Sequence, residues 1–236
     1  MENLNDTNGN VESAESYLNK GNVLLDQKDY EAAISAYDKA LDLNPNLADA
    51  YFKRGNAKDA IGQYFEAISD YDAAIRLDPD DAIAYYNRGV LKSKLGHPEA
   101  AILDYDAAIR LNPNYASAYY NLGLAKDAIG QYFEAISDYD AAIRLNPNEA
   151  DAYNNRGVSK SKLGHPEAAI LDYDAAIRLN PNEAKVHYNR GNAKTELGLT
   201  DDAKRDFQTA LNLAEKMEDE ELKSRIMKRL ENLETR

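Results

Sequence analysis

The chain has 236 residues, with 28 Lys and Arg against 41 Asp and Glu, so its formal net charge at pH 7 is −13. It contains no cysteine, which excludes disulfides, thiolate zinc sites, iron–sulfur clusters and a cysteine nucleophile. The negative charge disfavours broad attraction to nucleic-acid phosphates or anionic lipid. No apolar run reaches the roughly 18 residues that predict a membrane span. We therefore expect neither nucleic-acid binding nor membrane insertion.

The N-terminal segment, MENLNDTNGNVES, is polar, and we expect residues 1–13 to be disordered. It has neither the basic region nor the apolar region of a secretory signal. On that absence the sequence favours a cytoplasmic location.

From residue 14 onward the chain repeats itself every 34 residues. The clearest markers are five equally spaced prolines: Pro45, Pro79, Pro113, Pro147 and Pro181. A fixed period of this length is typical of a solenoid, in which each repeat is one supersecondary unit. The period predicts six repeats, numbered 1 to 6 in chain order: 14–47, 48–81, 82–115, 116–149, 150–183 and 184–217.

Each repeat is predicted to form two helices, as repeat 2 illustrates. The first helix is expected over 49–61 and ends before Gly62, because glycine readily adopts the left-handed conformation after a helix. The second is expected over about 65–77, and Pro79 prevents its continuation. Within the second helix, the spacing places Ala67, Tyr71 and Ala74 on one face. The two alanines allow close helix packing, and the tyrosine ring fills the space between repeats.

These positions resemble the tetratricopeptide repeat, a helix–turn–helix unit of the same length. The resemblance covers residues 14–217, with six repeats in register. It implies an all-α fold in which the repeats stack into a right-handed α-α superhelix with a concave groove. Basic residues at the seventh position, His187 at an aromatic position and Glu215 in place of the last proline depart from the pattern. The last departure predicts that the final second helix continues further.

The C-terminal segment, 218–236, predicts one more helix with a single apolar stripe: Leu222, Ile226, Leu230 and Leu233. We expect it to cap the solenoid by covering the exposed face of repeat 6. The alternative is an amphipathic helix that binds a partner.

Catalytic or metal chemistry finds little support. His97 and His165 occupy the same loop position two repeats apart, and His187 stands at a core position. No histidine pair has the i, i+4 spacing of a helical zinc site, and there is no glycine-rich phosphate loop. The sequence therefore predicts no enzyme, no metal site and no cofactor. Four Asp–Arg pairs on the second helices have the spacing of exposed i, i+4 ion pairs: Asp72–Arg76, Asp106–Arg110, Asp140–Arg144 and Asp174–Arg178.

A second level of repetition is informative, because residues 48–115 are nearly repeated by 116–183, with 12 differences in 68 positions. Six of the differences fall at the second, fifth, sixth and ninth positions of the first helices. In proteins of the family it resembles, these positions line the concave groove. We infer that the groove has diversified. The alternative is that solvent-facing positions have simply drifted.

The predicted groove combines a column of asparagines at the sixth position with apolar and aromatic neighbours. An amide side chain donates and accepts together, so such a column can hold the backbone of an extended peptide. It resembles the asparagine ladder of some tetratricopeptide superhelices, although asparagine is also common at this position in the family. The predicted site residues are Asn19, Asn22, Phe52, Lys53, Asn56, Tyr86, Asn87, Tyr120, Asn121, Leu124, Asn155, Tyr188, Asn189 and Asn192.

The sequence thus predicts a monomeric protein-interaction scaffold that binds an extended peptide or partner segment. The partner should not be strongly acidic, because the negatively charged surface of this chain would repel it. The alternative is a self-associating scaffold, in which near-identical repeats stack end to end between molecules. A third possibility implied by the resemblance is the carboxylate clamp that holds acidic chaperone tails. It is incomplete here, because Leu18 and Phe52 stand where a lysine is required.

Overall fold

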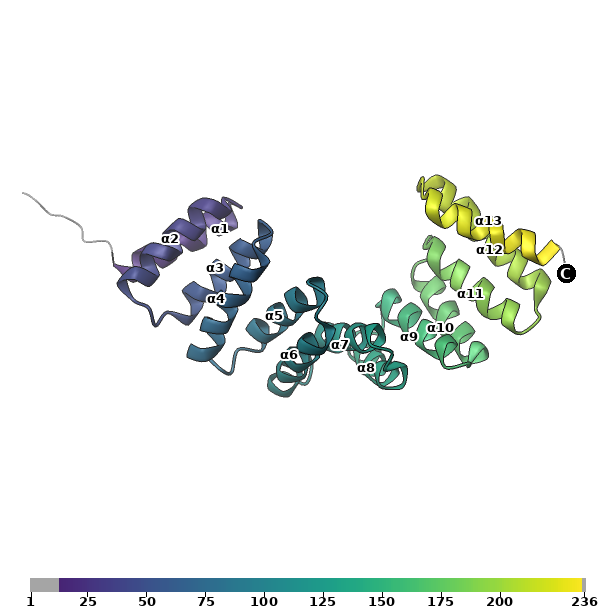
Figure 1. Ribbon diagram of the computed structural model, residues 1–236, viewed down its shortest axis with the longest axis horizontal. Coiled ribbons are helices and arrows are strands. Elements are labelled where there is room, and N and C mark those ends of the chain that lie inside the picture. The colour runs from purple at the N-terminus through teal and green to yellow at the C-terminus, as the bar shows by residue number, and fades with distance from the viewer. Residues whose placement is uncertain (1–12, 235–236) are drawn as a thin grey trace, which may run out of the picture. The chain divides into compact units, whose positions relative to one another are not determined.

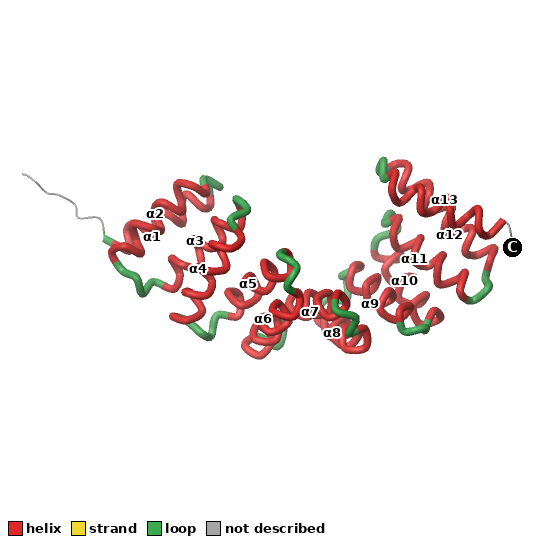
Figure 2. Tube along the Cα trace, in the orientation of Figure 1, coloured by secondary structure: helices red, strands yellow, loops and turns green. Residues whose placement is uncertain are grey.

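The computed structural model describes residues 13–234, and this part of the chain consists of thirteen α-helices with no strand (Figures 1 and 2). The predicted all-α class is confirmed. The helices are α1 (Ala14–Asp26), α2 (Tyr30–Leu43), α3 (Ala48–Ala60), α4 (Tyr64–Leu77), α5 (Ala82–Lys94), α6 (Pro98–Leu111), α7 (Ala116–Ala128), α8 (Tyr132–Leu145), α9 (Ala150–Lys162), α10 (Pro166–Leu179), α11 (Ala184–Glu196), α12 (Thr200–Lys216) and α13 (Glu220–Glu234). The segment predicted to be disordered, 1–13, lies outside the described residues except for Ser13, whose side chain caps α1 by accepting from the backbone N–H of Ser16.

Short loops join the helices, as the green segments of Figure 2 show. The turn after α3 has Gly62 at φ 80°, so the predicted left-handed glycine is confirmed. Its backbone N–H donates to the carbonyl of Asp59, which ends the helix. In the first repeat the same place is taken by Lys28 at φ 61°, so the turn has the same backbone conformation without glycine.

The chain divides into two compact units, with the boundary between His97 and Pro98. In the N-terminal unit, α1 to α4 each pack against the helix that follows, and α1 also approaches α3. In the C-terminal unit, α6 to α13 pack in the same sequential way. There the first helices α7, α9 and α11 also approach one another in turn, so they form a continuous layer.

In repeats 1, 2, 4, 5 and 6, an aromatic ring from the second helix packs against a glycine of the first helix. Tyr71 is 1% exposed, and Gly55 lies so close to it that an added Cβ would stand 2.8 Å from Tyr71 Cε1. Glycine is therefore required in α3 by the approach of the ring. The rings at the same position of the other repeats are equally buried: Tyr37, Tyr105, Tyr139, Tyr173 and Phe207.

The C-terminal end differs from the other repeats. Because Glu215 replaces the proline, α12 continues to Lys216, which confirms the predicted extension. Glu218, at φ 57°, then reverses the chain. Leu222 and Ile226 of α13 are buried against the core of repeat 6. The apolar stripe of α13 is thus used within the chain.

The predicted i, i+4 ion pairs on the second helices are wrong. The Asp72 carboxylate instead pairs with Arg88 of the next repeat, at 2.6 Å. Asp140 and Asp174 likewise pair with arginines sixteen residues onward, Arg156 and Arg190. These aspartates pair with the half-buried arginine at the seventh position of the next repeat and not with the exposed arginine four residues onward. An exposed i, i+4 pair contributes only about 0.2–0.5 kcal/mol, so little is lost when it does not form. For the fourth aspartate, Asp106, the next repeat offers no arginine at this place, because Leu122 occupies its seventh position.

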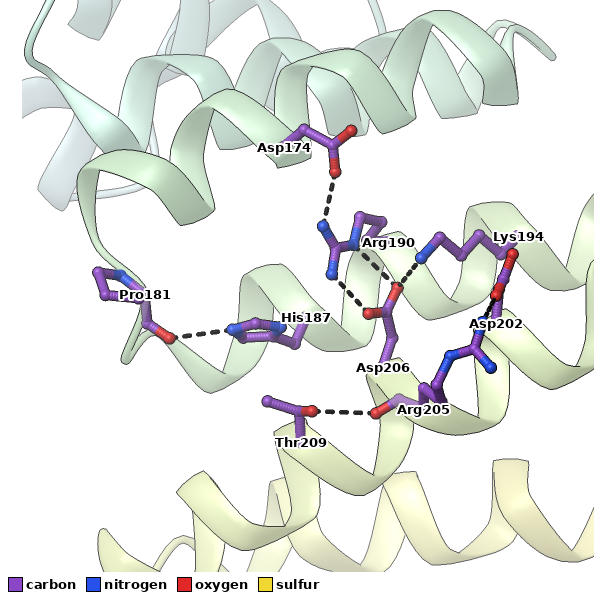
Figure 3. Close-up of polar contacts among 9 residues, drawn as sticks. All are labelled: Asp174, Pro181, His187, Arg190, Lys194, Asp202, Arg205, Asp206 and Thr209. Carbon is purple, nitrogen blue, oxygen red and sulfur yellow. Dashed lines mark hydrogen bonds and ion pairs between the residues drawn. The ribbon is translucent and has the colours of Figure 1, made fainter.

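The seventh-position arginines Arg54, Arg156 and Arg190 each also bind a buried aspartate of their own repeat. Figure 3 shows this arrangement at α11 and α12, where Arg190 lies between Asp174 and Asp206. Its Nε and one terminal nitrogen donate to Asp206 at 2.9 and 2.6 Å, and Lys194 contacts the same carboxylate at 2.8 Å. Burial alone would raise the pKa of Asp206, but the bonds from Arg190 and Lys194 outweigh it and lower that pKa. The same set recurs as Arg54–Asp70–Lys58 and Arg156–Asp172–Lys160.

Repeat 4 has only half of this arrangement. Leu122 replaces the arginine, and buried Asp138 has Lys126 as its cation partner, with Nζ at 2.7 Å from Oδ2. Here burial outweighs the single lysine and raises the pKa of Asp138. Two aspartates at the same repeat position therefore have pKa values shifted in opposite directions, which follows from one substitution in the neighbouring helix.

Candidate functional site

The first-helix surface, defined by the second, fifth, sixth and ninth positions of each first helix, is where the predicted site residues lie. Asn19 and Leu124 are exposed, and Tyr188 is only 7% exposed. The others are half-buried: Asn22, Phe52, Lys53, Asn56, Tyr86, Asn87, Tyr120, Asn121, Asn155, Asn189 and Asn192. Most of these side chains thus present one edge to solvent and one edge to the fold.

In the N-terminal unit, the ninth-position asparagines hold core tyrosines. The Asn56 carbonyl oxygen accepts from the Tyr71 hydroxyl at 2.8 Å and from Asn87 Nδ2 at 3.2 Å. Asn22 accepts from the Tyr37 hydroxyl at 2.9 Å. Both lone pairs of the Asn56 oxygen are therefore used within the fold, and the sixth-position Asn87 is oriented by it.

In the C-terminal unit, hydrogen bonds connect the amides from one repeat to the next. Asn155 Nδ2 donates to the Tyr120 hydroxyl at 3.0 Å, and Asn189 Nδ2 donates to Asn154 Oδ1 at 3.1 Å. Asn154 in turn donates to Asn155 at 3.2 Å. Asn155 and Asn189 each use one N–H in the contact with the preceding repeat, and the second N–H of each is left to meet a ligand.

The fifth-position aromatic rings belong partly to the core. Phe52 packs on Tyr71 with ring centroids 5.9 Å apart, and Tyr120 packs on Tyr139 at 6.0 Å, both in tilted arrangements. Such tilted contacts are favourable for aromatic pairs and fix the ring orientation. The outer edge of each ring, and not its face, is therefore the part available to a partner.

A buried polar cluster in the C-terminal unit was not expected from the sequence. The Tyr139 hydroxyl donates to Asp127 Oδ2 at 2.9 Å, and the Ser159 hydroxyl donates to Asp127 Oδ1 at 2.7 Å. Burial raises the pKa of Asp127, although both hydroxyls oppose that shift. The cause of the cluster is Leu124, which occupies the place of Asn56 and cannot accept a bond from the tyrosine.

Two of the differences between 48–115 and 116–183 are therefore coupled. In segment 48–115, Asn56 accepts a hydrogen bond from the Tyr71 hydroxyl, and the residue that corresponds to Ser159 is the buried Leu91. Where Leu124 replaces the asparagine, Ser159 supplies a second donor to the carboxylate that takes over. The signal in the sequence was the change from leucine to serine at a buried helix position, in the repeat that follows the change from asparagine to leucine.

This coupling predicts non-additive mutations. Ser159→Leu removes one donor from a half-buried carboxylate and should lower the free energy of unfolding by about 1–3 kcal/mol. The double variant with Leu124→Asn should recover most of that loss, because Tyr139 can then bond to the ninth residue as Tyr71 does. Urea denaturation of the wild type, both single variants and the double variant measures the coupling. Strictly additive losses would contradict the coupled arrangement.

The C-terminal helix covers one predicted site residue. Tyr188 is mostly buried because α13 packs beside it, with the Arg225 guanidinium carbon 5.2 Å from the ring centroid. Burial alone would raise the pKa of Tyr188, but the neighbouring side chains of Arg229, Asn192 and Arg225 outweigh it and lower that pKa.

The histidines lie where the sequence placed them. His97 and His165 are exposed in loops. His187 is buried, and its Nε2 lies 3.0 Å from the carbonyl oxygen of Pro181 (Figure 3). Within residues 13–234, no cluster of three or more His, Asp or Glu side chains is arranged to hold a metal ion. None of the helices in that range is both long and apolar enough to cross a bilayer.

Comparison with known proteins agrees with the repeat architecture. A family model described as a TPR repeat matches residues 21–58, 60–96 and 128–164. Models described as a tetratricopeptide repeat match 82–115, 150–183, 104–137 and 184–217. A search of curated protein sequences found no match.

Several solved structures are similar to this chain. YrrB, described as a TPR protein with an unusual peptide-binding site, is 31% identical, with a TM-score of 0.70 over 75% of this chain and 91% of its own. MamA is 32% identical, with a TM-score of 0.69 over 74% of this chain and 95% of its own. PilF of Pseudomonas aeruginosa, at 19% identity, shares the fold with a TM-score of 0.74 over 92% of this chain and 97% of its own. The family matches and the packed helix pairs together show that the chain belongs to the tetratricopeptide repeat family.

Proposed function

We propose that the chain is a protein-interaction scaffold that binds an extended partner segment on the first-helix surface of its C-terminal unit. The observation that carries the proposal is the hydrogen-bonded row of amides, Asn154, Asn155 and Asn189, which joins successive repeats. An extended backbone has N–H and C=O groups on its edges, and amides that are already oriented bind them at a lower entropic cost. The peptide-binding site described for the similar protein YrrB supports the proposal.

The chemistry of the surface defines the partner. Leu124 is 36% exposed beside the edge of Tyr120, which favours an apolar side chain at that place. The second positions of the first helices are acidic in several repeats: Glu15, Asp49 and Asp151, all exposed. Along these repeats the partner should be neutral or basic, because like charges in apposition are unfavourable.

Binding along the surface is preferred over end-to-end stacking of molecules. The apolar face of repeat 6 is covered by Leu222, Ile226 and Leu233 of α13, so it is not available to the first repeat of a second copy. The proposal assigns no catalytic role to the chain.

A triple variant tests the proposal. Replacement of Asn121, Asn155 and Asn189 by alanine should weaken binding to an array of ten-residue peptides by about tenfold or more, since each hydrogen bond contributes about 0.5–1.5 kcal/mol. The matched control replaces three exposed loop asparagines by alanine: Asn114, Asn148 and Asn182. Thermal unfolding of both variants establishes that the fold is intact. Undiminished binding by the first variant, or no peptide bound by the wild type, would overturn the proposal.

A further inference from the structure

The charge of the first-helix surface changes sign at the last repeat. At the second position, the C-terminal unit has Ser117, then Asp151, then Lys185. Lys185 is exposed on α11 and lies one helical turn before Tyr188 and Asn189. A positive charge in a chain with a net charge of −13 therefore marks the end of the row of amides.

Two arginines of α13 stand beside the same place. The Arg225 guanidinium carbon lies 5.2 Å from the centroid of the Tyr188 ring, and Arg225 and Arg229 are both close enough to the Tyr188 hydroxyl to lower its pKa. They are one helical turn apart on α13, so their side chains lie on the same face of that helix. The two guanidinium groups thus lie on the side of α13 that packs beside Tyr188.

Arg225 and Arg229 differ from the arginines of repeat 6, which form ion pairs with aspartates. Arg190 binds two aspartates and Arg205 pairs with Asp202 (Figure 3). Within the described residues, neither Arg225 nor Arg229 forms an ion pair with a carboxylate, although the chain is rich in them. Each guanidinium has five N–H donors, and within the described residues none of them is used by a carboxylate.

We propose that Arg225 and Arg229 form a subsite for one carboxylate group of the bound segment. The subsite rests on the proposed function, and it places an Asp, a Glu or the free C-terminus of the partner at the α13 end of the surface. Arginine recognises carboxylates through paired N–H donors. The contact of Arg225 with the Tyr188 ring orients one of the two groups before binding. Lys185 and Asn192 flank the subsite and add charge and a further amide.

The location separates this subsite from the carboxylate clamp considered above. That clamp uses lysine and asparagine on the first helices of three successive repeats, and here Leu18 and Phe52 leave it incomplete. Arg225 and Arg229 belong to the helix that follows the last repeat. The carboxylate is therefore bound where the surface ends, next to apolar and neutral positions of the preceding repeats.

The test uses three short probes and the full chain. The probes are N-acetyl-Leu-Asp-Glu with a free C-terminus, the same peptide with a C-terminal amide, and N-acetyl-Leu-Asn-Gln amide. The arginine Nε–Hε resonances are followed by NMR during titration. Saturable shifts of Arg225 and Arg229 with both acidic probes, and none with the neutral probe, would support a subsite for side-chain carboxylates. Shifts only with the free C-terminus would support a subsite for the end of a chain.

Variants separate this subsite from general attraction of anions. Arg225→Gln with Arg229→Gln should weaken binding of the acidic probes by about tenfold or more, because it removes both paired donors. The control Lys228→Gln, exposed on the same helix, should change binding by less than about twofold. Equal binding by the double variant, or equal shifts at Arg205, would overturn the subsite. Peptides from the array that bind the double variant as well as wild type would leave the proposed function intact while the subsite fails.

Discussion

Lys126→Met should lower the free energy of unfolding by about 3–5 kcal/mol near neutral pH, because it removes the cation that pairs with a buried carboxylate. Asp138 is 9% exposed and its Oδ2 pairs with Lys126 at 2.7 Å. Leu122 stands where other repeats supply an arginine, so no second cation compensates for the loss. Urea denaturation of the variant and the wild type measures the difference.

The loss should depend on pH with a defined sign. Burial already raises the pKa of Asp138 above its ordinary value of 3.8, and removal of Lys126 raises that pKa further. The folded state then binds the proton more tightly than the unfolded chain, so stability falls as pH rises from about 3.8 through the raised value. The deficit of Lys126→Met should therefore be smaller near pH 5 than near pH 8.

Two further variants keep this prediction specific. Lys160→Met removes the matching lysine in repeat 5, where Arg156 still binds Asp172 through two bonds, and should cost about 1 kcal/mol. Addition of Leu122→Arg to Lys126→Met should recover most of the stability, because it supplies the arginine of the other repeats. Equal losses for the two lysine variants would show that the arginine does not matter.

Tyr71→Ala should lower the free energy of unfolding by about 3–5 kcal/mol, as for other aromatic side chains removed from a core. The ring is 1% exposed and is packed against Gly55 and Ala67, which have too few side-chain atoms to fill the void. Chemical denaturation gives the loss directly, and a value below about 1 kcal/mol would mean that the ring is not in the core.

Tyr71→Phe provides the matched control for this substitution. It keeps the ring and removes only the hydroxyl that donates to Asn56 at 2.8 Å. The expected loss is about 1 kcal/mol, the usual net contribution of one hydrogen bond. The difference between the two variants separates the packing of the ring from its polar contact.

Much of the fold could be predicted because its signals are local and recur with one period. Gly62 ends a helix through its own backbone conformation, and Pro79 stops one through its own ring. Tyr71 was assigned to the core from its spacing with two alanines on the same helix. Each of these inferences depends only on residues within one helix or turn, and not on contacts between repeats.

The polar contacts could not be predicted in the same way, because they depend on distances between helices. Asp72 had an arginine four residues onward, yet its partner is Arg88 of the next repeat. The sequence also placed Asn56 in the groove without showing that Tyr71 uses its carbonyl oxygen. Tyr188 was predicted to be available, and the position of α13 determines that most of it is covered.

The arginine–aspartate contact between repeats has a consequence for how the gene can change in length. Arg54 meets Asp38, Arg156 meets Asp140 and Arg190 meets Asp174, so these junctions use the same two side chains. Unequal recombination between the two near-identical segments, with the exchange before the seventh position of repeats 2 and 4, would add 68 residues and place Arg54 in the repeat after Asp106, an aspartate at the same repeat position as Asp38. The longer descendant would then inherit a complete junction at the new join, without any compensating mutation.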